Sequence, residues 1–153
     1  MSLFGVLPIS GSGMDVMQTW LNTISGNIAN MNDGVNPAAQ AYQPEYVFAV
    51  PVPGDPAATT AEGQAGQGVA VGAIEYSPSS VLAYQPNNPQ AATASQVQQG
   101  QVAPNEQGMV KYPDVDLGAQ MVDTVMAQTS YQADVQVINK ATSAYQSAMT
   151  IGH

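Results

Sequence analysis

The sequence predicts an α+β fold, in which long N- and C-terminal helices pack as a coiled-coil-like pair and a small β-rich domain lies between them in the chain. Two observations carry this prediction. Apolar residues recur at helical spacing near both ends of the 153-residue chain, the pattern of a helix with one apolar seam. The middle holds most of the prolines and glycines between short apolar runs, as in strands joined by turns.

We therefore expect three regions. Residues 1–35 contain the N-terminal helix, residues 36–112 form the β-rich middle domain, and residues 113–153 contain the C-terminal helix. Two stretches of the middle, about 54–67 and 90–107, are rich in Ala, Gln, Thr, Gly and Pro. That composition predicts flexible loops.

The N-terminal helix is predicted from an apolar seam with alternating spacings of three and four. Its members are Met14, Met17, Leu21, Ile24, Ile28 and Met31. Ser12 followed by Asp15 resembles a capping box, which predicts a helix start at that point. The cluster Asn30–Gly34 is typical of a helix end. Trp20 lies beside the seam, and the sequence leaves open whether it packs within the chain or against a neighbouring subunit.

The C-terminal helix is predicted from a longer seam of the same kind. Its members are Leu117, Met121, Val125, Tyr131, Val135, Ile138, Tyr145 and Met149. Asp114 and Asp116 follow Pro113 and are candidates for capping the helix, while Gly152 is expected to end it. A helix of about 35 residues would be about 50 Å long, longer than an ordinary small domain needs.

Three strands are predicted in the middle domain. Residues 46–50 form an apolar run that meets Pro51, which limits it to an edge or an end of a sheet. Residues 68–76 alternate weakly. Residues 81–84 are expected to pair with them after a turn at Ser77-Pro78.

The composition argues against several classes of function. Two lysines and no arginine stand against eleven acidic residues, for a net charge of −9, so nucleic acid and anionic membranes are poor partners. No stretch of 18 apolar residues predicts membrane insertion. With no cysteine and only His153, at the end of the chain, we expect no catalytic triad, metal centre or cofactor site. Helix capping is the favoured role of Asp114 and Asp116 over a shared cation.

The helix positions outside the seams hold Gln, Thr, Ser, Asn, Ala and Gly in place of the Lys and Glu that decorate solvated coiled coils. Small and uncharged side chains favour burial against other protein on several sides. Burying one seam does not offset the conformational entropy lost by ordering a helix. We therefore expect both ends to be poorly ordered in the free monomer and to become helical on assembly.

Several stretches resemble the flagellar axial proteins and, among them, the FlgC family of proximal-rod proteins. They are ISGSGMDVMQTWLNTISGNIAN (9–30), YQPNNPQA (84–91), GMVKYPDVD (108–116), MVDTVMAQTSYQADVQVINKA (121–141) and MTIGH (149–153). The Asn-Ile-Ala-Asn element marks the wider axial family, and Tyr-Pro-Asp-Val-Asp before the last helix is the more specific sign.

The resemblance implies a non-enzymatic structural subunit of the flagellar rod, in which the seam residues and Trp20 pack between subunits that assemble helically. It implies a periplasmic position in the basal body, reached through the flagellar type III export apparatus without a cleaved signal peptide. Implied partners are that apparatus, proximal and distal rod proteins, and proteins at the junction of rod and membrane ring. The alternatives are another rod paralogue, or a secreted coiled-coil adhesin or other self-assembling surface protein.

Overall fold

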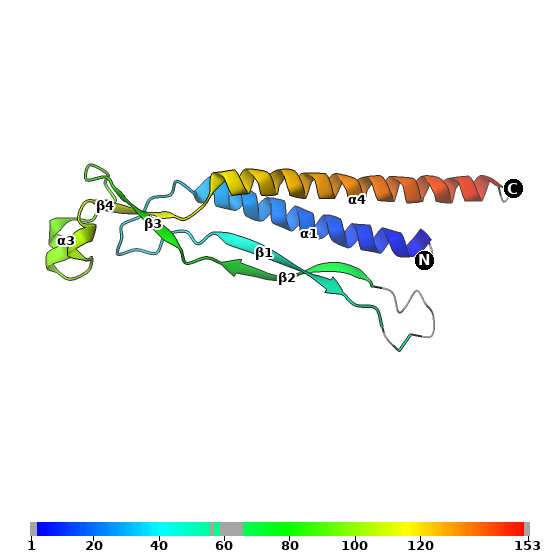
Figure 1. Cartoon of the computed structure of the whole chain (residues 1–153), viewed down its shortest axis with the longest axis horizontal. Coiled ribbons are helices and arrows are strands. Elements are labelled where there is room, and N and C mark those ends of the chain that lie inside the picture. The colour runs from blue at the N-terminus through cyan, green and yellow to red at the C-terminus, as the bar shows by residue number, and fades with distance from the viewer. Residues whose placement is uncertain (1–2, 56, 59–65, 152–153) are drawn as a thin grey trace. The chain divides into compact units, whose positions relative to one another are not determined.

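Figure 1 shows the computed structural model of the chain, which describes residues 3–55, 57–58 and 66–151. Two long helices, α1 (Leu3–Asn30) and α4 (Leu117–Ile151), flank four strands in the chain. The strands are β1 (Glu45–Val52), β2 (Gly68–Tyr76), β3 (Ser80–Tyr84) and β4 (Met109–Pro113), with a short helix α3 (Ala94–Gln98) and a 3₁₀ turn (Pro104–Glu106) before β4. The predicted α+β class is confirmed.

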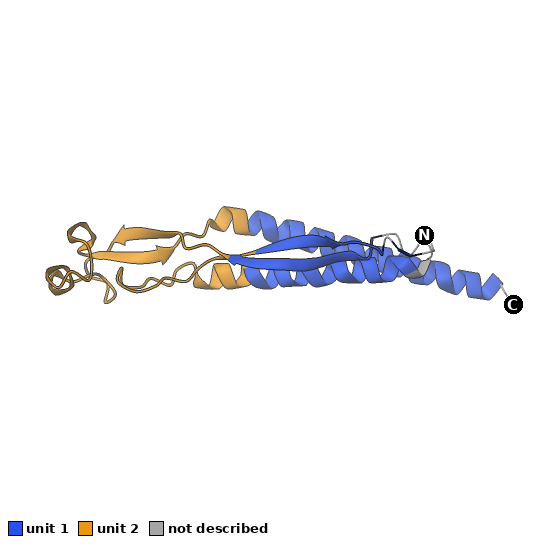
Figure 2. Ribbon diagram, turned by 90° about the horizontal axis from the view of Figure 1, so that it is seen from below, with its two compact units in different colours: residues 1–23, 47–75, 121–153 blue, residues 24–46, 76–120 orange. Residues whose placement is uncertain are grey.

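The chain forms two compact units (Figure 2). Unit 1 contains residues 1–23, 47–75 and 121–153, and unit 2 contains residues 24–46 and 76–120. Each unit therefore takes helical residues from both ends of the chain and strand residues from the middle. The division into two helical regions and a middle domain at residues 36 and 112 stays a prediction.

The four described strands form two separate two-stranded ribbons. β1 pairs with β2, and β3 pairs with β4 in an antiparallel register that runs from Ser80 opposite Pro113 to Tyr84 opposite Met109. The prediction that residues 81–84 pair with 68–76 is therefore wrong. Their partner β4 carries a lysine at its centre and ends in proline, so its sequence shows no apolar alternation, although its second residue, Val110, is fully buried.

The start of α1 also corrects the sequence-based prediction. The helix begins at Leu3, with Pro8 inside it, and runs through Ser12 without a break. The Ser12 hydroxyl donates to the carbonyl of Ile9 within the helix, at 2.8 Å, so the predicted capping box is wrong. The helix ends at Asn30, where the predicted Asn/Asp/Gly cluster begins.

The start of α4 follows the prediction. Asp116 stands just before the first helical residue, and its Oδ1 accepts from the backbone N–H groups of Gly118 at 2.8 Å and Ala119 at 3.2 Å. This is the geometry of an N-cap. The helix has 35 residues, as predicted, while Gly152 and His153 lie outside the described residues.

The predicted loop 90–107 holds more structure than expected, since α3 and the 3₁₀ turn lie within it. Thr93 and Gln96 form a capping box at α3: the Gln96 N–H donates to Thr93 Oγ1 at 3.3 Å, and the Thr93 N–H donates to Gln96 Oε1 at 2.9 Å. Most of the other predicted loop, 54–67, lies outside the described residues.

Candidate assembly interface

In unit 1, the most buried residues of α1 are small and lie one position before the predicted seam. Val16 is buried to 3% exposure, whereas Met14, Met17 and Leu21 are half-buried. At Gly13, a Cβ would stand 2.5 Å from Asp134 Oδ2 of α4. The two helices thus approach closely at Gly13. Part of the side chain of each of these three seam residues remains exposed to solvent.

One hydroxyl joins α1 to the ribbon of unit 1. Ser12 Oγ accepts from the backbone N–H of Val69 in β2 at 3.1 Å. Gly68 makes this approach possible, because its φ of +114° suits glycine and a Cβ there would stand 2.1 Å from Ser12 Oγ. Ser12 therefore fixes where β2 begins against the helix.

Trp20 lies within unit 1 beside β1. Its half-buried side chain lines a small apolar cavity of about 130 Å³ with Val16, Met17, Val47 and Ala49. The sequence left open whether Trp20 packs within the chain or against another subunit, and the structure gives it contact with a strand of its own chain.

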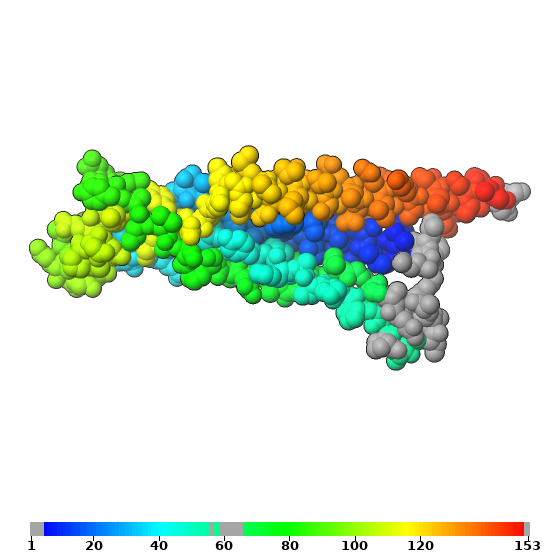
Figure 3. All heavy atoms as spheres, in the orientation of Figure 1, coloured from blue at the N-terminus to red at the C-terminus, as the bar shows by residue number. Residues whose placement is uncertain are grey.

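The predicted seam of α4 is exposed over much of its length. In unit 1, Met121 is 61%, Val125 62%, Tyr145 45% and Met149 54% exposed, and the side of α4 turned to the viewer in Figure 3 carries no other segment. Tyr131, Val135 and Ile138 are half-buried. Leu117, which belongs to unit 2, is 42% exposed. Among the described residues of α4 in unit 1, Ala127 is fully buried.

Five exposed hydroxyls of α4 have their hydrogen-bond donors already engaged. They donate to backbone carbonyls three or four residues earlier, at 2.8–3.0 Å: Thr129 to Val125, Thr142 to Ile138, Ser143 to Asn139, Ser147 to Ser143, and Thr150 to Ser147. A buried donor without an acceptor is costly. Because these donors are satisfied inside the helix, another protein surface can cover them without that cost.

Unit 2 is organised around the side chain of Asn27, which is 1% exposed. Its Nδ2 donates to the carbonyl of Glu45 at 2.8 Å and to Gln120 Oε1 at 3.2 Å. Its Oδ1 accepts from the Glu45 N–H at 2.9 Å and from the Tyr42 hydroxyl at 3.0 Å. One amide thus joins the end of α1, the start of β1 and the start of α4.

Burial raises the pKa of Tyr42 in this cluster, and the negative charge of Glu45 raises it further. A side-chain hydrogen bond to Asn30 acts in the opposite direction. Asn30 also closes the last turn of α1, since its Nδ2 donates to the Gly26 carbonyl at 2.8 Å. The phenol is therefore held neutral, as its donation to Asn27 requires. We call Asn27, Asn30, Tyr42, Glu45 and Gln120 the Asn27 cluster.

Lys111, one of two lysines in the chain, is committed to a loop of unit 2. Its backbone exchanges two hydrogen bonds of 2.9 Å with Val35. Its Nζ donates to the carbonyls of Pro37 and, at 3.0 Å, Ala39. This lysine therefore holds the chain between α1 and β1 against β4.

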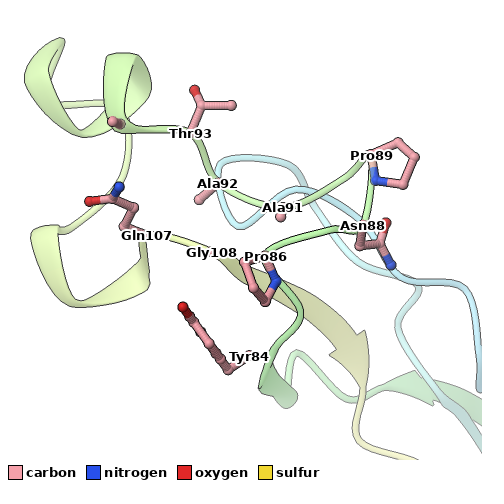
Figure 4. A pocket seen from close by; sticks show the side chains of 10 residues that line it. Tyr84, Pro86, Asn88, Pro89, Ala91, Ala92, Thr93, Gln107 and Gly108 are labelled. Atoms are coloured by element: carbon pink, nitrogen blue, oxygen red, sulfur yellow. The ribbon is translucent and has the colours of Figure 1, made fainter.

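A cavity of about 510 Å³ in unit 2 lies beside Tyr84 and Pro86 (Figure 4). Its lining also includes Pro89, Thr93 and Gln107. The lining residues include no carboxylate, lysine or histidine, and the phenol of Tyr84 is their one ionisable side chain.

No cluster of three or more potential metal ligands occurs among the described residues. Among the same residues, no helix is both long enough and apolar enough to cross a bilayer. Asp116, considered as a cation ligand with Asp114, uses one oxygen as the helix cap.

Sequence reasoning missed the Asn27 cluster, because it used Asn30 as a helix-end signal and the Asn-Ile-Ala-Asn element only as a mark of the axial family. The available signal was the row Val16, Trp20, Thr23 and Asn27, spaced four, three and four along one side of α1. A polar residue on such a row predicts a buried hydrogen-bonded contact.

Comparison with known proteins identifies similar chains. Residues 106–151 match the family described as flagellar basal body rod FlgEFG protein C-terminal. The chain is 32% identical to flagellar basal-body rod protein FlgC of Salmonella typhimurium, with 99% of both chains covered. It is 28% identical to the proteins of the same name from Borreliella burgdorferi and Bacillus subtilis, with 99% of this chain and 98% or more of each relative covered. The similarity therefore spans both terminal helices and the strands between them.

Proposed function

Because the chain belongs to the FlgC family of flagellar basal-body rod proteins and is a structural subunit of the rod, we propose that its terminal helices supply the contacts that build the rod. In this proposal the helices pack against neighbouring subunits in a helical array. The array lines the export channel and transmits torque. Helical growth requires contacts that do not close into a ring.

The observation that carries this proposal is the uncovered apolar face of α4. Met121 and Val125 are each more than 60% exposed, although side chains of this kind contribute about 1.5–3 kcal/mol each when fully buried. The neighbouring hydroxyls have satisfied donors. Contact with protein therefore gains the free energy of burying the apolar side chains. It costs little in lost hydrogen bonds to water, because the hydroxyl donors are already satisfied.

The same reasoning extends to the other seam residues. Met14, Met17, Trp20 and Leu21 of unit 1 are half-buried, so a neighbouring subunit would complete their burial. In unit 2, Ile28 and Met31 are also half-buried, whereas Ile24 is 3% exposed. Ile24 therefore contributes mainly to the interior of its own unit.

We propose further that the partners are proximal and distal rod proteins, proteins at the rod–membrane-ring junction and the flagellar type III export apparatus. The subunit lies in the periplasmic part of the basal body and is exported without a cleaved signal peptide. It has no catalytic role. Similarity along the whole chain to proteins named FlgC favours this assignment over another rod paralogue or a secreted adhesin.

Val125→Asp tests the proposed contacts. The wild-type side chain is 62% exposed, so a carboxylate there should change the stability of the free chain by less than about 0.5 kcal/mol. In the rod it would be buried without a partner and exclude the subunit. We expect the variant to be absent from purified basal bodies and the cells to be non-motile.

The matched control is Asn87→Asp, which adds the same charge at an exposed position of unit 2 outside α1 and α4. It should be incorporated and support motility. Normal incorporation of Val125→Asp into functional rods would refute the proposed role of the α4 face.

A further inference from the structure

The β1–β2 ribbon of unit 1 has two different faces. Side chains alternate along a strand, and Val47 and Ala49 line the cavity against Val16 and Trp20 of α1. These strand residues define the inner face, which lies toward α1, with Val47 half-buried and Ala49 exposed.

Phe48, Val50 and Ile74 define the opposite face, which we call the outer ribbon face. Phe48 and Val50 alternate with the inner residues. Ile74 belongs to the same face because a Cβ on Gly72, two residues before it, would point into the Val50 side chain at 2.5 Å. Phe48 is 49%, Val50 44% and Ile74 39% exposed.

An isolated two-stranded ribbon is marginally stable in water, and packing on one or both faces is what stabilises it. Here one face has α1 and the other has three large apolar side chains partly open to solvent. The outer ribbon face is therefore an incomplete packing surface.

Unit 1 carries a second apolar surface on α4. Met121, Val122, Val125 and Met126 are neighbours at helical spacing and are between 54% and 62% exposed. We call these four residues the α4 patch. A contiguous group of exposed apolar side chains on a soluble protein is a candidate interaction site.

We propose that the α4 patch of one copy of this chain packs on the outer ribbon face of a second copy. The inference rests on the proposed function, because an open helical stack requires two different surfaces that recognise each other. The α4 patch and the outer ribbon face differ in shape, since one is a helix ridge and the other a strand pair. Such a contact is heterologous and can repeat without closing.

The net charge of the chain opposes contact between copies, but neither of the two surfaces adds to that repulsion. Copies with a net charge of −9 repel one another, and Lys111 is held by two carbonyls of its own unit. The residues of both surfaces are uncharged. Contact between them therefore brings no carboxylate into a dry interface.

The size of the contact also has a consequence. The two surfaces comprise four and three side chains, whereas a stable interface between two proteins has about 20–30 residues a side and buries roughly 1,000 Å² or more. One such contact does not hold two copies together in dilute solution, but many become effective when other contacts align the subunits.

The absence of native cysteine allows a direct test by cross-linking in assembled rods. Cells co-express two chains, one with Val50→Cys and a tag, the other with Val125→Cys, and purified basal bodies are treated with a short bis-maleimide. We expect a tagged–untagged dimer in several-fold excess over control pairs. A second pair, Ile74→Cys with Met121→Cys, should give the same product.

Val137→Cys is the matched control, because it is also an exposed valine of α4, at 41%, and lies outside the α4 patch. Its pairing with Val50→Cys should give only background product. Equal yields for both helix positions, dimers of Val125→Cys chains alone, or cross-links from the ribbon only to a different protein would each overturn the inference.

Incorporation of the chain into the rod is measured in the same preparation. If the chain is absent from basal bodies in its wild-type form, the proposed function fails as well. If the variants are incorporated and no cross-link between the two surfaces forms, only the helix-on-ribbon contact fails.

Discussion

Asn27 and Val125 belong to the two long helices, and their surroundings differ in almost every respect. Asn27 is 1% exposed, and both polar atoms of its side chain have two hydrogen-bond partners each. Val125 is 62% exposed and lies among other apolar side chains that face solvent. The first region is complete within one chain, while the second, in the proposed function, gains its burial from another protein. The proposal therefore assigns fold and assembly to different residues of the same helices.

The largest effect on the free chain is expected from Asn27→Leu. This change removes all four hydrogen bonds and leaves the Tyr42 hydroxyl, the Glu45 backbone and the Gln120 amide without their partner in the cluster. We expect a loss of about 2–4 kcal/mol in the free energy of unfolding, measured by urea denaturation. Asn22→Leu, at an exposed position of the same helix, should cost less than about 0.5 kcal/mol.

The next largest effect is expected from Gly34→Ala. A Cβ there would stand 2.6 Å from the Tyr112 ring and 2.8 Å from Val110, so the fully buried Val110 would have to move. Overpacking of this kind costs about 1–3 kcal/mol, seen as a lower unfolding midpoint. Gly11→Ala, where a Cβ meets nothing within 4 Å, should instead stabilise α1 by up to about 1 kcal/mol.

A smaller loss is expected from Asp116→Ala. The carboxylate accepts from two backbone N–H groups at the start of α4, and removing such a cap costs about 1 kcal/mol. Asp116→Asn keeps an accepting oxygen and should retain most of the stability in thermal unfolding. If the alanine variant is as stable as the asparagine variant, the cap contributes nothing.

The smallest effect is a change of stability with pH. Burial and Glu45 raise the pKa of Tyr42, so its neutral form is favoured in the folded chain. The resulting stability is fully present below pH of about 10, the ordinary tyrosine value, and is lost as the pH rises through the higher folded pKa. Unfolding midpoints between pH 8 and 11 should therefore fall more for wild type than for Tyr42→Phe.

These predictions also show where sequence reasoning succeeded. The ends of helices carry local signals: the Asn/Asp/Gly cluster after Asn30 and the carboxylate at Asp116 act on adjacent backbone. The strands at 46–50 and 68–76 carry β-branched and aromatic residues at adjacent positions. Local chemistry was enough to predict these elements and the length of α4.

The errors arose where a residue depends on a distant partner. Ser12 has the form of a helix cap, but its hydroxyl accepts from Val69, 57 residues away. β4 has no apolar alternation of its own and becomes a strand by pairing with β3. Asn27 meets Gln120 across 93 residues, a proximity that helical spacing alone does not reveal.

The candidate interface was predictable only in part, because an apolar seam does not reveal which side of it the chain itself covers. In α1 the chain buries Val16 and Thr23, each one position before a residue of the predicted seam. In α4 it buries Ala127 and leaves Val125 exposed. Whether the exposed seam residues pack between subunits stays a prediction.

Hydrogen exchange of the full-length chain, free in dilute solution and incorporated in purified basal bodies, tests the central claim most directly. The claim predicts rapid exchange of the amides of residues 142–151 in the free chain and strong protection in the rod. The Glu45 amide, bonded to Asn27, should exchange more slowly than these in the free chain. Equal protection of residues 142–151 in both states would contradict the claim that neighbouring subunits complete the terminal helices.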